Sequence, residues 1–480
     1  MKSPFVQNPV NQLMRDAATG KSSRRELIRR GSALGLSGAL MSTVLGASAM
    51  AAQDATPEEA MPMGYTLVAP EWLTADYSGV ELNVVLGADG TGAPMDQAMC
   101  DLFASTTGAT VNYIKGAESA TDRLTFYTQT LNSESSDIDV AQVDVIWPGI
   151  IARHAVDLAE QATQLAETGA TFFERILNNN TIDGTTVSLP WFTDAGLLYY
   201  RTDLGEKYGF TEAPKTWMEL QEQAQAILDG EAADNDAFTG FTFQAKAYEG
   251  LTCNALEWIV SNDGGNIIEE DGTVTVDSEG AVAAIEMAKG WVGTIAPEAV
   301  TGYMEEDSRN IWQGGNAAFH RNWPYAFALG EADDSVIKGN FAIAVLPAGE
   351  GGNHAATLGG WNAFVSKYSE NVDAAKDFAK FMVSKEVQRS RAIERSSNPT
   401  IRELYEDPDV IAANPFMKDL FATFDGGAVA RPSNVAKDLY NDVSIAVFTK
   451  VNEILTGQHD DTAAALGDLK GELESIMEEV

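Results

Sequence analysis

Basic side chains are scarce in this chain. Its 480 residues include 32 lysines and arginines against 70 aspartates and glutamates, which gives a formal net charge of −38. A surface with this much negative charge repels nucleic-acid phosphates and anionic lipid headgroups. The composition therefore argues against nucleic acid and against an anionic membrane surface as partners.

Histidine is rare as well, and none of the histidines has the spacing of a metal site. His154, His320, His354 and His459 are isolated from one another, and the sequence contains no H-x-x-x-H or C-x-x-C motif. A G-x-S-x-G nucleophile motif is also absent. These absences argue against a metallo-hydrolase and a serine hydrolase, and we expect no metal and no cofactor.

The first fifty residues have the pattern of an export signal. Residues 23–29 read SRRELIR, a twin-arginine pattern, and an apolar run rich in glycine, serine and alanine follows to residue 49. Small residues at 47–51 fit a cleavage site. We therefore expect residues 1–51 to be a signal peptide for the twin-arginine route into the periplasm, cleaved near Ala49 to Ala51. No later hydrophobic segment is long enough to cross a membrane.

Cysteine occurs only twice, at Cys100 and Cys253. An exported protein can form a disulfide, but a single pair so far apart in the sequence is equally compatible with two buried free thiols. Both alternatives remain open at this stage.

From residue 81 the chain alternates apolar strands with helical patterns. Strands are predicted at 82–86, 110–114 and 140–146, with helices between them. This βαβαβ order predicts a parallel sheet whose ligand loops lie at the carboxyl ends of the strands, which brings Asp89 and Asp144 to one edge.

A second α/β region is predicted after residue 201. Thr216 is a candidate N-cap for a helix, and strands are expected at 240–243 and 317–319. The exported chain, about 430 residues, is long enough for two such domains.

Aromatic residues gather at three proline or glycine breaks. The stretches are PWFTD at 190–194, NWPY at 322–325 and LGGW at 358–361. The apolar run 197–200 predicts a buried strand, so we expect 190–194 to lie at its mouth. Aromatic rings beside a carboxylate suit a polar ligand with apolar faces, such as a sugar, although any one tryptophan alone would more often belong to the core.

Several longer motifs are similar to those of one known family, and they occur in the same order as in that family. They are DVIWPGI, PWFTDAGLLYYRTDL with EKYGF and PKTW, KAYEGLTCNALEW, GNAAFHRNWPYAFAL, AATLGGW with VSKYS, and AVARPS. Together they resemble the trehalose/maltose-binding proteins among the extracellular solute-binding proteins, family 1, of ABC transporters. The resemblance extends from about residue 81 to 457.

The resemblance implies an α/β fold of the periplasmic-binding-protein type, with two lobes joined by a three-crossing hinge and a ligand cleft between them. The expected lobes are 80–191 plus 359–398 and 192–358 plus 399–480, with crossings near 190–194, 358–361 and 397–399. It also implies a monomeric binding protein, not an enzyme, that delivers an α-glucoside disaccharide to permease subunits. Trehalose, maltose, sucrose or a related osmolyte such as glucosylglycerol all remain open.

Nine positions match sugar contacts of the family. They are Asp144, Asp194, Trp323, Tyr325, Gly360, Trp361 and Arg431, with Arg123 and Tyr248 as further matches. The chain departs from the pattern at Phe192, where thermophilic members carry tyrosine, and in the loop 89–96, where GTGAPM replaces glutamate-rich sequence and the expected acid cannot be placed. Both departures concern which sugar is bound.

The alternative function is a secreted glycoside hydrolase. Such an enzyme needs two carboxylates on either side of one glycosidic bond, and Asp144 with Asp194 could supply them. Among 70 acidic residues, however, some such pair is always available. The sequence therefore favours the binding protein.

Overall fold

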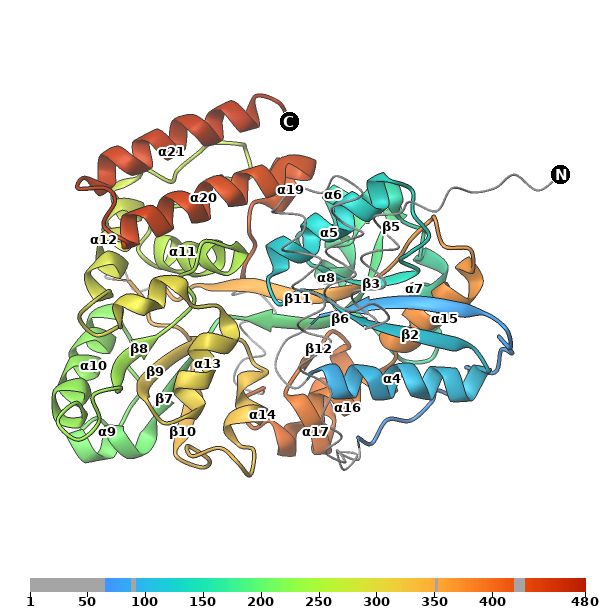
Figure 1. The fold of residues 1–480 in the computed structure, drawn as a ribbon, viewed down its shortest axis with the longest axis horizontal. Coiled ribbons are helices and arrows are strands. Elements are labelled where there is room, and N and C mark those ends of the chain that lie inside the picture. The colour runs from blue at the N-terminus through green and yellow to red at the C-terminus, as the bar shows by residue number, and fades with distance from the viewer. Residues whose placement is uncertain (1–64, 88–91, 350–352, 418–427) are drawn as a thin grey trace, which may run out of the picture. The chain divides into compact units, whose positions relative to one another are not determined.

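The computed structural model describes residues 65–87, 92–349, 353–417 and 428–480. The predicted signal peptide and Asp89 lie outside these residues. Residues Tyr65–Val480 form one compact unit that contains two main β-sheets (Figure 1).

The first sheet has the strand order β12-β6-β11-β3-β1-β2, with β13 pairing to β11. Strand β1 is parallel to β2 and β3, as the βαβαβ pattern predicted, whereas β11 runs antiparallel to β3 and β6. The strands are β1 (Glu81–Leu86), β2 (Thr110–Lys115), β3 (Val140–Asp144), β6 (Ser188–Ala195), β11 (Ala356–Val365), β12 (Asn398–Pro399) and β13 (Ala428–Val429).

Side chains that alternate along these strands enter two different cores. Val84 packs with α4 (Gly92–Thr107) and α15 (Val372–Met382), whereas its neighbour Val85 packs with α5 (Ala120–Asn132). The same alternation separates Val140 from Ala141. Because successive strand side chains point to opposite faces, the sheet is covered by helices on both sides, which explains its continuous apolar runs.

The second sheet has the order β10-β7-β9-β8. Strands β8 and β9 are parallel, and β7 is antiparallel to both β9 and β10. Their bounds are β7 (Leu197–Arg201), β8 (Thr239–Thr242), β9 (Ala317–Asn322) and β10 (Phe341–Ala344). We call the elements around the first sheet the first lobe and those around the second sheet the second lobe.

Helices of the second lobe enclose an aromatic core. Trp217, Trp258 and Trp291 pack around Phe241 and Phe243 with ring centroids 4.9–6.0 Å apart. The C-terminal helices α20 and α21 pack on α11 and α12 (Figure 1). The bounds are α10 (Trp217–Glu231), α11 (Glu249–Ser261), α12 (Glu279–Trp291), α13 (Glu305–Gln313), α20 (Tyr440–Leu455) and α21 (Thr462–Met477). The predicted cap of α10 is confirmed, since the Thr216 hydroxyl accepts from the Glu219 amide at 3.1 Å.

The other α-helices of the described residues are at most 11 residues long. They are α6 (Pro148–Ile151), α7 (Ala159–Glu167), α8 (Glu174–Asn179), α9 (Thr202–Tyr208), α14 (Ala326–Gly330), α16 (Lys385–Arg395), α17 (Pro408–Ala413) and α19 (Ser433–Ala436).

The chain passes from the first sheet to the second at a single residue. Strand β6 ends at Ala195, β7 begins at Leu197, and Gly196 lies between them. The return leads from β10 to β11, and β12 then adds to the edge of β6. The lobe boundaries 80–191 plus 359–398 and 192–358 plus 399–480 stay predictions.

Two local predictions were wrong. Residues 190–194 do not form a loop at the mouth of a strand but belong to β6, and Gly360 with Trp361 lies within β11 and not after a strand. Proline is unfavourable in a central strand because it cannot donate to the ladder. Here the register shifts: Phe192 pairs with Trp361 and Pro190 with Asn362, so Trp191 is the extra residue of a bulge.

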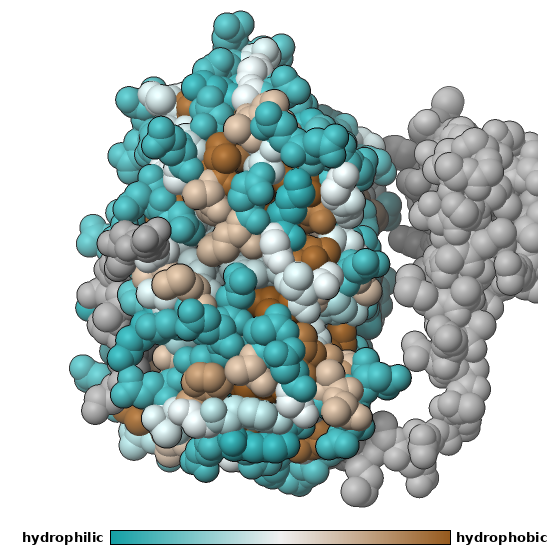
Figure 2. Space-filling model, turned by 90° about the vertical axis from the view of Figure 1, so that its left-hand side faces the viewer, coloured by the Kyte–Doolittle hydropathy of each residue, from teal (hydrophilic) through white to brown (hydrophobic). Residues whose placement is uncertain are grey.

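The two cysteines are free and buried, which decides between the two alternatives that the sequence left open. None of the helices in the described residues is both long enough and apolar enough to span a membrane. On the face drawn in Figure 2, hydrophilic residues cover most of the surface and hydrophobic ones appear between them in small groups.

Candidate functional site

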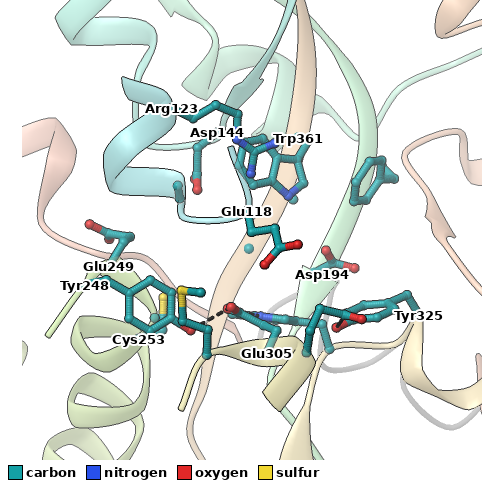
Figure 3. A pocket seen from close by; sticks show the side chains of 18 of the residues that line it. Glu118, Arg123, Asp144, Asp194, Tyr248, Glu249, Cys253, Glu305, Tyr325 and Trp361 are labelled. Carbon is teal, nitrogen blue, oxygen red and sulfur yellow. Dashed lines mark hydrogen bonds between the residues drawn. The ribbon is translucent and has the colours of Figure 1, made fainter. Parts of the chain in front are cut away.

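A cleft lies between the two lobes, beside β6 and β11 (Figure 3). The empty space among its lining residues, counted with the part that is open to solvent, is about 990 Å³. All nine predicted contact residues line it. The lining consists of Glu118, Ala120, Arg123, Asp144, Phe192, Asp194, Tyr248, Glu249, Gly250, Cys253, Met304, Glu305, Glu306, Asp307, Trp323, Tyr325, Gly359, Gly360, Trp361, Ser397 and Arg431.

Trp361 and Arg123 form the wall of the first lobe. The Arg123 guanidinium carbon lies 4.1 Å from the centroid of the Trp361 ring, and Trp147 meets the same ring edge-on at 5.5 Å. Arg123 is 3% exposed, and in the part of the chain that the structure describes its Nε and Nη1 have no hydrogen-bond partner. A buried guanidinium with unused donors can bind an acceptor that a ligand brings.

Backbone geometry places the Trp361 ring. Gly360 has φ +123°, and a Cβ at this position would lie 2.5 Å from the Phe192 carbonyl oxygen. Only glycine therefore allows β11 to approach β6 this closely. Trp361 pairs across the sheet with Asp144, the last residue of β3, so both side chains reach the same edge.

Trp323 follows β9 and forms the facing wall, in the second lobe. Its Nε1 donates to Glu305 Oε1 at 3.3 Å, and the Arg321 guanidinium carbon lies 4.0 Å from its ring centroid. A Cβ on Gly359 would lie 3.0 Å from the ring of Trp323 and 3.2 Å from the Asp194 Cβ. The glycine thus lets Asp194 and Trp323 border the cleft side by side.

The acidic first turn of α13 orients two tyrosines. Tyr248 donates to Glu305 Oε2 and Tyr325 donates to Glu306 Oε1, both at 2.6 Å. Burial raises the pKa of both phenols, and the neighbouring carboxylates raise it further. Both tyrosines are therefore fixed hydrogen-bonded groups, and Glu306 is also paired to Arg309 at 2.6 Å.

Arg431 lines the cleft and bridges the two lobes. Its Nη2 lies 2.9 Å from Asp144 Oδ1 in the first lobe, and its Nη1 lies 2.8 Å from Glu249 Oε1 in the second. Tyr440 and Ser444 also donate to Glu249, at 2.7 and 2.6 Å. Burial raises the pKa of Glu249, whereas the charge of Arg431 lowers it. The arginine that the sequence assigned to the ligand therefore also compensates two buried acids.

Sequence reasoning missed several lining residues, above all Glu118, Glu249, Glu305 and Glu306. No signal singled them out, because acids are common throughout the chain. Cys253 also lines the cleft, and burial raises the pKa of its thiol, so it stays a neutral, weakly polar group. Over the described ranges, no cluster of three or more His, Cys, Asp or Glu side chains could hold a metal ion.

A two-lobed α/β fold with a cleft of polar and aromatic side chains defines a solute-binding protein. The model of the family described as bacterial extracellular solute-binding protein matches residues 88–389. A "Probable ABC transporter-binding protein" of Deinococcus radiodurans is 45% identical over 397 residues, which cover 82% of this chain and 94% of that one.

Solved structures of sugar-bound proteins have the same fold as this chain. The maltose-bound MalE3 of T. maritima has a TM-score of 0.78 at 38% identity, covering 82% of this chain and 99% of that chain. A solute-binding protein from Thermotoga lettingae, bound with alpha-D-tagatose, shares the fold with a TM-score of 0.73 at 23% identity, over 83% and 100% of the two chains. The chain belongs to the bacterial extracellular solute-binding proteins, as its motifs predicted. These are binding components of ABC transporters and not enzymes.

Proposed function

We propose that this protein is the sugar-binding component of an ABC importer and that its ligand is an α-glucoside disaccharide of the trehalose, maltose or sucrose type. The observation that carries the proposal is the pair of tryptophans on opposite walls of the cleft, Trp361 in the first lobe and Trp323 in the second. Two rings suit two pyranose units, because each ring can cover the C–H face of one sugar.

Polar groups around the rings fit sugar hydroxyls. Asp194, which is 8% exposed, accepts hydroxyl hydrogens, and the unused N–H groups of Arg123 donate to hydroxyl oxygens. Phe192 brings no hydroxyl to the cleft wall. The ligand is therefore held by charge-assisted hydrogen bonds at its rim and by apolar contact on its faces.

Delivery depends on closure of the lobes over the sugar. A ligand that touches both walls binds the closed form better than the open one and so shifts the equilibrium toward closure. Arg431 assists, because it brings Asp144 and Glu249 from the two lobes to a single guanidinium. Permease subunits would then recognise the closed form.

Export by the twin-arginine route to the periplasm, a monomeric state and the lobe ranges given above belong to the same proposal. The twin-arginine pattern at residues 23–29 supports the export route, and the maltose-bound relative, which covers 82% of this chain, supports the division into two lobes.

A thermal-shift panel of disaccharides, followed by calorimetry, tests the proposal. We expect trehalose, maltose or sucrose to raise the melting temperature and to be recovered unchanged. Release of glucose would instead support the hydrolase. The ion pair of Asp144 with Arg431 speaks against that alternative, because it engages one of the two carboxylates that the hydrolase would need.

A further inference from the structure

We propose that Arg321 and Glu257 form a positioning unit that fixes the Trp323 ring as a stacking surface and ties it to the strands that connect the lobes. This inference rests on the proposed function, because it concerns how the same cleft holds a sugar. Neither residue lines the cleft, so both act through Trp323.

Arg321 supports the ring from one face. Its guanidinium carbon lies 4.0 Å from the Trp323 ring centroid, within the range of a cation–π contact. Arg321 lies near the end of β9, and Trp323 follows two positions later, directly after the strand. One face of the ring is thus occupied by the guanidinium, while the indole borders the cleft.

Every part of the guanidinium is held in turn. Nε lies 2.9 Å from Glu257 Oε2, Nη2 lies 2.5 Å from Glu257 Oε1, and Nη1 lies 3.1 Å from Gln244 Oε1. The side chains of the pair are 1% and 0% exposed. A bidentate pair of this kind fixes the plane of the guanidinium, and with it the plane of the ring above.

The same pair touches two of the connecting strands. Glu257 Oε1 accepts from the Thr357 amide of β11 at 3.1 Å. A Cβ on Gly196, the residue between β6 and β7, would lie 2.0 Å from Glu257 Oε1 and 2.6 Å from Arg321 Nη2. Any shift of these strands therefore moves the pair, and the pair moves the ring.

A buried ion pair is a poor source of stability, since apolar side chains of similar volume often replace it without loss. Fixing one geometry is the better-supported use of such a pair. This pair lies beneath a tryptophan that faces the ligand and against the strands that connect the lobes. The geometry that it fixes is therefore the orientation of the Trp323 ring.

A double-mutant cycle tests the inference, with maltose and trehalose as probes and calorimetry as the measurement. Arg321→Lys keeps the charge but loses the planar, bidentate group. We expect it to weaken sugar binding about tenfold when Trp323 is present. In the Trp323→Ala background it should cause no further loss, because its effect passes through the ring.

Arg201→Lys is the matched control. Arg201 is also a paired arginine of the second sheet, held by Asp203 at 2.6 Å, but it does not touch Trp323. It should leave the affinity unchanged. If Arg321→Lys weakens binding equally with and without Trp323, or does not weaken it at all, the positioning role is wrong.

Two further measurements cover the remaining outcomes. If Arg321→Lys does not fold, the variant with Arg321→Met and Glu257→Met removes both buried charges together, and wild-type affinity in that folded variant would overturn the inference. If the wild type binds no disaccharide, the proposed function fails separately. The positioning role can then be tested without a sugar, by acrylamide quenching of the Trp323 fluorescence, obtained as the difference between each protein and its Trp323→Phe variant. If Arg321 fixes the ring, Arg321→Lys should increase this quenching.

Discussion

Each wall of the cleft carries a tryptophan stacked on an arginine, but the two arginines are held differently. In the second lobe, the guanidinium of Arg321 under Trp323 is bonded to Glu257 and Gln244. In the first lobe, the Nε and Nη1 of Arg123 beside Trp361 have no hydrogen-bond partner among the described residues.

This difference in bonding distinguishes an arginine that supports a ring from one that can bind the ligand. A buried donor without a partner costs free energy, and a fold retains it where a ligand satisfies it. Arg123 lines the cleft and Arg321 does not. We therefore propose that Arg123 contacts the ligand and that Arg321 supports the protein's own architecture, although both arginines make the same contact with an indole ring.

Removing the rings should have the largest effect on binding. We expect Trp323→Ala and Trp361→Ala each to weaken sugar binding by about 2–4 kcal/mol, the range for a buried aromatic anchor. Of the two, only Trp361 packs against the two large hydrophobic clusters, so Trp361→Ala should also lower the free energy of unfolding, by about 3 kcal/mol, the low end of the range for such a change, because the ring is only partly buried. Calorimetry and thermal denaturation measure the two effects. Folded variants with normal affinity would show that the site lies elsewhere.

Replacing Arg123 should stabilise the ligand-free protein and weaken sugar binding. Arg123→Met keeps a chain that can cover Trp361 but removes the buried, unsatisfied donors. We expect sugar affinity to fall by about 2 kcal/mol, the value for hydrogen bonds to charged groups. The melting temperature of the ligand-free protein should rise. A lower melting temperature with unchanged affinity would instead make Arg123 a support like Arg321.

Asp194 tests the accepting side of the site. Asp194→Asn keeps the shape and removes one charged acceptor, which we expect to cost about 1.5–3 kcal/mol in binding. The residue lies within β6 beside Gly359, so the same change could instead disturb the strand. Titration separates the two: a structural role lowers the melting temperature and spares the affinity, whereas a ligand contact does the reverse.

Much of the fold and of the cleft could be predicted from the sequence. Apolar runs such as 82–86 and 197–200 are buried on both faces, and this leaves a clear pattern. Trp323 and Gly360 lie in short motifs whose order resembles a family, so their place in the cleft followed from that resemblance.

The remainder depends on contacts between distant residues. Pro190 predicted a break, but a bulge at Trp191 lets β6 continue through it. Glu305 could not be distinguished from other acids until its bonds to Tyr248 and Trp323 were seen. Arg321 carries no signal either, since its partner Glu257 is 64 positions away.

The smallest effect concerns His320, which precedes Arg321 in β9. His320 Nδ1 lies 3.2 Å from the Thr242 carbonyl oxygen, which can only accept, so the ring proton is on Nδ1. His320 Nε2 therefore accepts from Asn322 Nδ2, at 2.9 Å. Burial, together with the charges of Arg321 and Arg309, lowers the pKa of His320 to about 3, although the hydrogen bond to the Thr242 carbonyl raises it. The neutral ring belongs to the folded state, whereas the unfolded chain binds a proton near its ordinary pKa of about 6.5.

Stability from this group is therefore complete above pH 6.5 and is lost as the pH falls toward 3. Between pH 6.5 and 5.5 we expect the free energy of unfolding to drop by about 1 kcal/mol on this account. His320→Gln can make both hydrogen bonds without titrating, so the difference between the two unfolding curves isolates the histidine from the many carboxylates. Parallel curves over this range would mean that His320 is protonated in the folded protein at the same pH as in the unfolded chain, and the pH effect expected here would be wrong.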